Sequence, residues 1–279
     1  MKINTLTHKD AVWPKELNNI TPKVEQLYIR GKIPKSPKIG VIGTRRPTAY
    51  GLHATEALVR PLAAAGACIV SGMAIGIDSA AHRQALAAGG STIAVLPSSL
   101  QKPYPARHRG LAEQIANNGA LITEYSSTSN IYKGNFIARN RIIAAMSDVL
   151  LVVEAAERSG TMHTVDFAIQ LGKDVAAIPG PINHHYSMGT NRLLKDGVHL
   201  ITEPEDLIQL IGVELKQSDK IVLDEETKRV FDEISRQAQN VDQLRLNLGE
   251  NERNISIALT ELELQNLVAR RQDGMYARR

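Results

Sequence analysis

Lys38-Ile39-Gly40-Val41-Ile42-Gly43-Thr44-Arg45-Arg46 passes from a short apolar run to a glycine turn and then to two arginines. The apolar run predicts a buried strand of a parallel sheet, because helices cover both faces of such strands. Gly43 lets the chain turn sharply, and a helix after the turn would direct its positive end towards it. Backbone N–H groups at this turn, together with Thr44, Arg45 and Arg46, therefore predict an anion site suited to phosphate.

The loop does not match either of the common phosphate-binding motifs. Gly40, Gly43 and Gly51 lack the spacing of the dinucleotide fingerprint, and the sequence contains no Gly-Lys-Ser/Thr. On its own, the loop is better explained as a strand-end turn with two solvated arginines. The rest of the chain decides between the two interpretations.

Length and composition indicate a protein of two parts. The chain has 279 residues, 43% of them hydrophobic, which is enough for one large domain and a small one. Its apolar runs are too short to span a membrane and its N-terminus lacks a signal-peptide apolar region, so we expect a cytoplasmic protein without membrane contact. Cys68 is the single cysteine and lies in an apolar run, which predicts a buried side chain and excludes disulfides.

Short apolar runs alternate with helical patterns after residue 38, which predicts a Rossmann-like, doubly wound α/β domain with a mostly parallel sheet over residues 38–212. Residues 1–37 predict a short N-terminal cap with a helical stretch around residues 24–28. The expected strands are Ile39–Gly43, Cys68–Ser71, Thr92–Leu96, Ala120–Thr123, Val149–Val153 and Val175–Ile178. The expected helices are Gly51–Ala65, Asp78–Ala88, His108–Asn118, Asn135–Met146 and Thr164–Leu171.

Glycine follows four of the expected strands. In a doubly wound sheet the ligand crevice lies beyond the carboxyl ends of the strands, so the residues that follow each strand are the most informative. Each glycine alone is equally well explained by a tight turn, but together they predict a concave rim rich in backbone donors. The rim residues are Gly43, Ser71 and Gly72, Gly160 and Thr161, and Gly180.

A second informative stretch, Lys133 to Ser147, predicts a helix that carries cations and one aromatic side chain. Residues 126–147 include Lys133, Arg139 and Arg141 but no acidic residue. This pattern suits a non-specific single-strand binder, in which cations hold phosphates while a base stacks on a ring. The alternative is an amphipathic helix with a solvated face, although such faces usually mix both signs of charge. The candidate residues are Lys133, Asn135, Phe136, Arg139 and Asn140.

Metal-dependent and acid–base chemistry have weaker support. No pair of closely spaced carboxylates stands ready for two metal ions, which argues against a nuclease. Adjacent His184 and His185 point apart, so no metal site is expected. Asp78 and His82 lie four residues apart at a helix start. An acid–base pair is one interpretation, and a helix N-cap with a histidine packed against it is the favoured one.

Taken together, these segments resemble the bacterial DNA-processing protein family DprA/Smf. The resemblance implies a Rossmann-like domain that binds and protects single-stranded DNA, forms a homodimer, and loads the RecA recombinase during transformation or recombination. It implies no catalysis and no cofactor. The matching blocks are colinear over about residues 25–210: Val41–Arg45 with Tyr50-Gly51, Ser71–His82, Asn135–Ser147, Ser159–Thr161 with Thr164, Ile178–Gly180 and Ser187–Leu194.

Two motifs of the family imply DNA contacts in this chain. Arg45 corresponds to the arginine of the Gly-Ser-Arg motif, in which Thr44 replaces serine and keeps the hydroxyl. Ile137 stands where many members have proline, and the N-terminal helical domain of many members has no counterpart here. The second DNA-contacting segment matches Lys133, Phe136, Arg139 and Asn140.

The tail resembles the winged-helix module of many members, with a linker at residues 213–223 and the module at 224–279. From Lys220 onward there are 10 basic and 11 acidic residues, so the remaining 23 basic and 18 acidic residues give residues 1–219 a net charge of +5. The expected recognition helix, residues 253–264, carries Glu261 and Glu263, which phosphates repel. We therefore expect any DNA contact of the tail to come from the arginine-rich wing around Asp273-Gly274.

Two other functions stay open. Nucleotide-monophosphate phosphoribohydrolases share the broad Rossmann group and a Gly-Thr after a late strand. They need a glutamate three residues after that threonine, however, and Thr164 stands there instead. A winged-helix transcription regulator with a ligand-sensing Rossmann domain is the other alternative. It would prefer duplex DNA to single strands.

Overall fold

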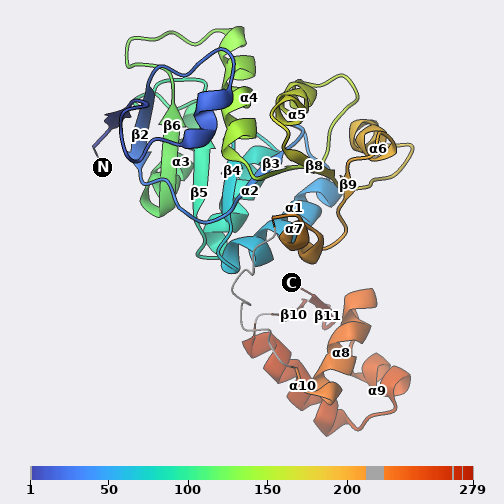
Figure 1. The fold of residues 1–279 in the computed structure, drawn as a ribbon. Coiled ribbons are helices and arrows are strands. Elements are labelled where there is room, and N and C mark those ends of the chain that lie inside the picture. The colour runs from blue at the N-terminus through green and yellow to red at the C-terminus, as the bar shows by residue number, and fades with distance from the viewer. Residues whose placement is uncertain (1, 212–222, 266, 272, 279) are drawn as a thin grey trace. The chain divides into compact units, whose positions relative to one another are not determined.

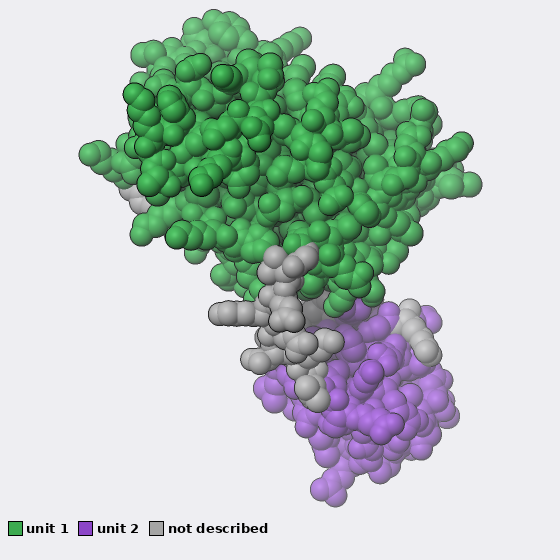
Figure 2. Space-filling model, viewed as in Figure 1, with its two compact units in different colours: residues 1–218 green, residues 219–279 purple. Residues whose placement is uncertain are grey.

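The computed structural model describes residues 2–211, 223–265, 267–271 and 273–278. The chain divides into two compact units, residues 1–218 and 219–279, which Figure 2 shows in green and purple. The expected linker, residues 213–223, lies outside the described residues except for Leu223.

Within the described residues, the larger unit contains a nine-stranded sheet in the order β1-β2-β6-β5-β4-β3-β7-β8-β9 (Figure 1). The seven strands from β6 to β9 in this order are parallel, whereas β1 and β2 are antiparallel additions at one edge. This confirms the mostly parallel α/β fold, and the six expected strands are correct to within one residue at each end. The strands are β1 Asn4–Leu6, β2 Leu27–Gly31, β3 Lys38–Ile42, β4 Cys68–Ser71, β5 Thr92–Val95, β6 Gly119–Thr123, β7 Val149–Val152, β8 Asp174–Ala177 and β9 His199–Leu200.

Helices cover both faces of the sheet. The 3-10 helix η1 (Lys15–Asn19), α4 (Lys133–Met146), α5 (Gly160–Gln170) and α6 (Met188–Lys195) pack on one face. The opposite face carries α1 (Ala49–Ala64), α2 (Ile77–Ala87), α3 (Arg109–Asn118) and α7 (Pro204–Ile211). The five expected helices are present, but α5 begins at Gly160 and not at Thr164. No helix in the described part of the chain has the length and apolar character needed to cross a membrane.

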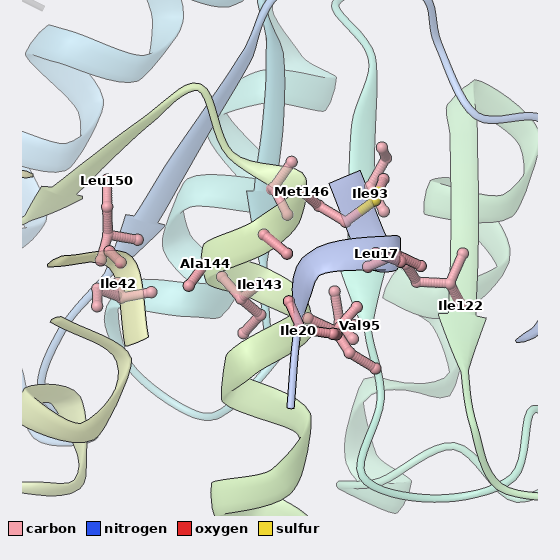
Figure 3. Close-up of a cluster of buried hydrophobic side chains, with 14 of the residues drawn as sticks. Leu17, Ile20, Ile42, Ile93, Val95, Ile122, Ile143, Ala144, Met146 and Leu150 are labelled. Atoms are coloured by element: carbon pink, nitrogen blue, oxygen red, sulfur yellow. The ribbon is translucent and has the colours of Figure 1, made fainter. Parts of the chain in front are cut away.

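The core on the α4 face joins elements that are distant in sequence (Figure 3). Ile143 and Met146 of α4 pack over β5, which contributes Val95, and Leu17 of η1 and Ile20 just after η1 close the layer from outside. All five side chains are at most 3% exposed. Burial of each large aliphatic side chain contributes roughly 1.5–3 kcal/mol, so this cluster fixes the position of α4 on the sheet.

The N-terminal segment differs from the expected cap. The helical stretch expected around residues 24–28 is wrong, because Leu27–Gly31 forms strand β2 and pairs antiparallel with β6. Leu27 and Ile29 are buried while Tyr28 between them is half-buried, which is the period of two that a strand requires. Residues 1–37 thus extend the sheet.

The smaller unit contains α8 (Glu225–Arg236), α9 (Val241–Leu248), α10 (Glu252–Leu264) and an antiparallel hairpin of β10 (Val268–Arg270) and β11 (Tyr276–Arg278). The three helices and the hairpin share one apolar core, in which Val268 is buried and Leu267 and Tyr276 pack at the edge. This is the winged-helix arrangement expected of the tail.

A buried histidine of α2 lies against the starts of β4 and β5. His82 is 0% exposed, and its Nδ1 lies 2.7 Å from Thr92 Oγ1. Because Thr92 Oγ1 donates its proton to the Ile69 carbonyl at 2.6 Å, His82 Nδ1–H must be the donor to Thr92. Burial, assisted by the positive charges of Arg139 and His108, lowers the pKa of His82 from 6.5 to about 3.

We predict that His82 makes the larger unit less stable in acid. Its folded pKa lies below its unfolded pKa, so the stabilisation is present at neutral pH and is lost as pH falls through the unfolded value. As the pH falls from about 7 to about 5, this residue should lower the free energy of unfolding by about 2 kcal/mol. Denaturant unfolding followed by the fluorescence of Trp13, the single tryptophan, measures it. Equal pH dependence in wild type and His82→Gln would contradict the assignment.

Candidate functional site

The order of the strands places a crevice at one end of the sheet. From β3 the chain crosses through α1 to β4 on one side, while β7 lies on its other side and leads to β8. The carboxyl ends of β3 and β7 therefore mark the switch point at which doubly wound sheets bind ligands. A cavity of about 400 Å³ opens there. Its lining comes from the ends of three strands and from α4 and α5: Ile42, Gly43, Thr44, Arg45, Ala74, Asp78, Phe136, Ile137, Arg139, Asn140, Ile143, Ser159, Gly160, Thr161, His163 and Thr164.

The β3–α1 turn is held by the buried carboxylate of Glu154, which follows β7. Glu154 Oε2 accepts from the Thr48 backbone N–H at 3.0 Å, and Oε1 accepts from the Thr48 hydroxyl at 2.5 Å. A side chain at Gly51 would overlap this carboxylate, so the glycine makes room for it. The positive end of α1 was expected to receive an external anion. That expectation is wrong, because Glu154 already occupies it.

The neighbouring β4–α2 turn fixes Thr44 from the other side. The Thr44 backbone N–H donates to the Glu154 carbonyl at 2.7 Å, and its own carbonyl accepts from the Ile77 N–H at 3.2 Å. Gly76 has a φ of +94°, and a Cβ there would overlap the Thr44 carbonyl oxygen. The loop that presents Arg45 is therefore rigidly anchored at its base.

Arg45 is the exposed cation at the mouth of the cavity. Its guanidinium carbon lies 5.3 Å from the centroid of the Phe136 ring. Phe136 in turn packs edge to face with Tyr104, with ring centroids 5.4 Å apart. Among the described residues no carboxylate pairs with Arg45, so its charge is available to an anion. A cation beside two aromatic rings can hold a phosphate and stack a base together.

Arg139 was predicted to lie at the rim, and this is wrong. Its side chain is 4% exposed and donates to the Gly72 carbonyl at the end of β4 and the Val95 carbonyl at the end of β5. Burial lowers the pKa of Arg139 to about 10, partly offset by the Asp78 carboxylate, so the guanidinium remains charged at neutral pH. A Cβ at Gly72 would overlap the guanidinium, which explains the glycine. Arg139 positions α4.

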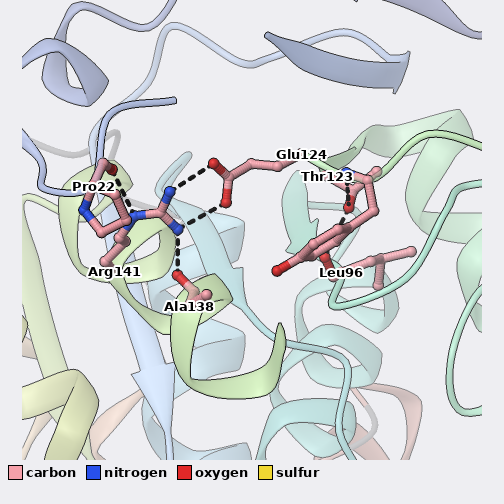
Figure 4. Close-up of polar contacts among 7 residues, drawn as sticks. Pro22, Leu96, Thr123, Glu124, Ala138 and Arg141 are labelled. Atoms are coloured by element: carbon pink, nitrogen blue, oxygen red, sulfur yellow. Dashed lines mark hydrogen bonds and ion pairs between the residues drawn. The ribbon is translucent and has the colours of Figure 1, made fainter. Parts of the chain in front are cut away.

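The expected row of cations along α4 does not exist. Arg141 is buried and forms a bidentate pair with Glu124, with nitrogen–oxygen distances of 2.7 and 2.6 Å (Figure 4). Arg141 also donates to the carbonyls of Pro22 and Ala138, which ties α4 to the N-terminal segment. Lys133, at the exposed start of the helix, is the remaining cation of the three, and it does not line the cavity.

The N-terminus of α5 supplies further donors. Its N-cap residue, Ser159, makes no capping hydrogen bond, and within the described residues its buried Oγ has no partner. The first N–H groups of a helix lack intrahelical partners, so this end favours an anion. Asn140 links the α4 and α5 sides of the cavity. Its Oδ1 accepts from Arg139 Nε at 3.2 Å, and its amide nitrogen donates to the Gly160 carbonyl at 3.4 Å. Gly160 and Thr161 both line the cavity, as the expected rim requires.

Several expected rim residues lie elsewhere. Ser71 is fully buried and donates to the Val41 carbonyl at 2.6 Å, so it cannot touch a ligand. Gly72 faces a smaller hollow beside the cavity. Asn135 donates to the Pro97 and Asn130 carbonyls and so holds the preceding loop. The Asn191 side chain hydrogen-bonds to both the N–H and the carbonyl of Gly180, so neither group is available to a ligand. Arg46 is exposed but does not line the cavity.

The sequence reasoning missed three residues of the site: Tyr104, Ser159 and His163. Tyr104 follows β5, one of the two expected strands that no glycine follows. The rule that placed the other loops would have found it. Ser159 lies in the matched block Ser159–Thr161 but was not among the candidate site residues, and His163 was expected in the loop before α5, which begins at Gly160 and not at Thr164.

The alternative chemistries gain no support from the described residues. Asp78 is not the N-cap, which is Gly76. It lies inside α2 and accepts from the Ala74 N–H at 3.3 Å. His82 turns to Thr92 and does not pair with Asp78. In the described part of the chain no group of three or more His, Cys, Asp or Glu side chains could hold a metal ion.

Comparison with known proteins gives two family matches. Residues 4–212 match the model of DNA recombination-mediator protein A, and residues 215–274 match that of the DprA winged helix domain. A putative DNA processing protein DprA of Mycobacterium tuberculosis is 44% identical over 172 residues, which are 62% of this chain and 44% of that protein. The chain thus spans less than half the length of that relative. DNA processing protein DprA of Bacillus subtilis is 34% identical over 210 residues, covering 74% of this chain and 71% of that protein.

Solved structures agree. The crystal structure of DNA processing protein A from Streptococcus pneumoniae has a TM-score of 0.71 at 36% identity, covering 75% of this chain and 74% of that one. The protein of the same name from Helicobacter pylori has a TM-score of 0.67 at 34% identity, covering 75% of this chain and 94% of that one. The latter structure concerns the single-stranded DNA binding mode of the Helicobacter protein.

We predict that Arg139→Ala and Arg45→Ala differ in stability. Loss of Arg139 leaves two buried carbonyls and Asp78 without their cation, so unfolding free energy should fall by about 2 kcal/mol or more. Arg45 is exposed, so Arg45→Ala should stay within about 0.5 kcal/mol of wild type. Denaturant unfolding monitored by Trp13 compares them. If Arg139→Ala is as stable as Arg45→Ala, Arg139 is not the anchor of α4.

Proposed function

The chain belongs to the DNA recombination-mediator protein A family, and from that premise we propose that it binds and protects single-stranded DNA as a recombination mediator. One observation carries the proposal. The unpaired guanidinium of Arg45 lies 5.3 Å from the Phe136 ring at the mouth of a cavity that also holds the start of α5. Single-strand binders combine these elements, a cation for the backbone and a ring for the bases.

The proposed binding mode assigns each element a part. Phosphates meet Arg45, the Thr44 hydroxyl and the backbone N–H groups of Gly160 and Thr161, which position the strand without reading its sequence. Bases stack on Phe136, and Tyr104 supports that ring from its edge. Every base has a π face, so binding is sequence-tolerant. Arg139 and Asn140 hold the two walls in place and need not touch DNA. Gly43, Gly72 and Asn135 shape the turns, while Lys133 and Arg46 add charge nearby.

We further propose that the chain works as a homodimer in the cytoplasm and loads the RecA recombinase onto the bound strand. Support comes from family membership, because a mediator of recombination must hand its strand to a recombinase. We keep the proposed division into a DNA-binding domain, residues 38–212, a linker, residues 213–223, and a winged-helix domain, residues 224–279. The strands contributed by residues 1–37 belong with the first of these.

We propose that the chain acts by binding and not by catalysis. The rival phosphoribohydrolase function needs a carboxylate three residues after Thr161, and Thr164 at that place is buried and neutral. The rival transcription regulator would read duplex DNA through α10. That helix exposes the carboxylate of Glu263, whereas Glu261 turns to α8 and accepts from the Thr227 hydroxyl at 3.1 Å. Phosphates repel such a helix.

We predict tighter binding to single-stranded than to duplex DNA, with little dependence on sequence. If three to five phosphates are neutralised, log K should fall with log salt with a slope of about −2 to −4. Fluorescence anisotropy with labelled oligonucleotides at several salt concentrations measures both quantities. Tighter duplex binding, or a slope near zero, would sink the proposal.

We predict that Arg45→Ala and Phe136→Leu weaken binding to single strands while the fold is kept. The lost charge-assisted contact is worth about 1.5–3 kcal/mol of binding free energy. Phe136→Leu keeps the apolar bulk but removes the ring, and should cost about 1 kcal/mol or more. Arg60→Ala, on the exposed flank of α1 where Arg60 pairs with Glu56, is the matched control. Wild-type affinity in the Arg45/Phe136 double variant would place the site elsewhere.

A further inference from the structure

The positive charge of the chain is concentrated at its N-terminus. Residues 1–38 hold eight Lys and Arg against three Asp and Glu, a net charge of +5, while the whole chain carries +4. The other 241 residues therefore have a net charge of −1. The one arginine of this segment, Arg30, forms an ion pair with Glu113 of α3 and does not line the cavity. The remaining cations of the segment are lysines.

Four of these lysines line one groove, which we call the lysine groove: Lys15, Lys32, Lys35 and Lys38. It lies between the loop after β1 and the loop joining β2 to β3, and its volume is about 860 Å³. Glu16 is the single carboxylate in its lining. Within the described residues none of the four ammonium groups forms an ion pair. A concave surface with four unpaired cations concentrates a strong positive potential.

The lysine groove lies at the opposite end of the sheet from the cavity. Because β2 runs antiparallel to β6, its last residue, Gly31, lies beside Ala120 near the start of β6. Lys38 is the first residue of β3, whose last residues lead into the cavity. The groove thus marks the amino ends of the parallel strands. A strand of five residues is about 16 Å long, which sets the scale of the separation.

The backbone beneath the lysines is held rigidly. Gly31 has a φ of +101° and packs against Gly119, where a side chain would overlap the carbonyl oxygen. The Lys32 N–H donates to the Gly119 carbonyl at 2.7 Å, and the Pro37 carbonyl accepts from the Cys68 N–H at 2.8 Å. The Lys38 N–H donates to Asp148 Oδ2 at 2.8 Å. The groove is therefore preformed, with only the lysine side chains left to adjust.

Smaller hollows lie between the cavity and the lysine groove, around the edge of the sheet that β1 forms. Tyr104 and Pro105 line the hollow beside the cavity, and Pro103, Arg109 and Ile3 line the next one. Lys2 and Asn4 then lead to a hollow that shares Asn4 and Lys32 with the lysine groove. The lining residues of successive hollows are chain neighbours or identical. Exposed Arg109, Lys2 and Lys32 supply cations along this path.

We propose that the lysine groove binds the sugar-phosphate backbone of the same DNA strand that occupies the cavity, carried there around the β1 edge. This inference rests on the proposed function. Lysine is a point charge that neutralises phosphate without reading bases. The groove offers no exposed ring for stacking, because Trp13 is 6% exposed and its Nε1 donates to Asn18 at 2.9 Å. Its concave form and its four lysines against one carboxylate favour a flexible polyanion.

The test compares two triple variants of equal charge. Lys15→Gln, Lys32→Gln and Lys35→Gln together remove the groove's exposed cations. Lys23→Gln, Lys195→Gln and Lys228→Gln remove three exposed lysines that line neither the groove nor the cavity. The probes are oligodeoxythymidines of about six nucleotides, which fill one site, and of about 30 nucleotides, which can reach both. Anisotropy gives the affinity and the salt slope for each probe.

The groove variant should bind the short probe like wild type. Its salt slope for the long probe should become shallower by about 2, since each lost phosphate contact contributes about 0.7. An unchanged long-probe slope, or an equal change in the control variant, would overturn the proposal. Loss of polyglutamate binding with DNA binding intact would reassign the groove to an acidic protein. Failure of wild type to bind the short probe would instead count against the cavity. The groove is then tested with the long probe in an Arg45→Ala background.

Discussion

The hydrogen bonds of one buried guanidinium fix the helix that carries the proposed binding surface. Arg139 joins the carbonyl ends of β4 and β5 through Gly72 and Val95, and so fixes α4 against the strand ends. Phe136 lies three residues earlier on the same face of that helix, and this places its ring over the mouth of the cavity. The arrangement needs glycine at position 72, because any side chain there would overlap the guanidinium. The buried Arg139 thus helps to position the exposed Arg45. The Arg45 guanidinium lies over the ring of Phe136, and Phe136 belongs to the helix that Arg139 anchors.

Glu154 has the corresponding role on the other side of the cavity. Its carboxylate satisfies the Thr48 N–H and hydroxyl, so the positive end of α1 is neutralised from within. In the proposed binding mode, an external phosphate therefore meets the uncapped start of α5 and Arg45. This separates the site from the usual dinucleotide-binding arrangement, in which the first helix of the sheet receives the phosphates. The absence of the three-glycine fingerprint agrees with that difference.

The sequence predicted the parallel strands and their helices because apolar runs and strand-end glycines are local signals. It could not tell which of three arginines, Arg45, Arg139 and Arg141, would be exposed, because no local pattern records their partners. Arg45 is exposed, Arg139 is bonded to two strand ends and Arg141 pairs with Glu124, and these differences arise from long-range packing. The edge strands β1 and β2 were missed because they lack the continuous buried apolar run of the central strands. Tyr104 was missed because no glycine follows its strand, β5.

We propose that single-stranded DNA crosses the aromatic rim of the cavity. Photo-crosslinking with an oligodeoxynucleotide that carries 5-iododeoxyuridine, followed by peptide mapping, tests this directly, because the modified base reacts with the aromatic ring on which it stacks. The main crosslinked peptide should contain Phe136, with Tyr104 as the secondary site, and excess salt should abolish both. Crosslinks confined to the winged-helix unit, with none around the cavity, would contradict it.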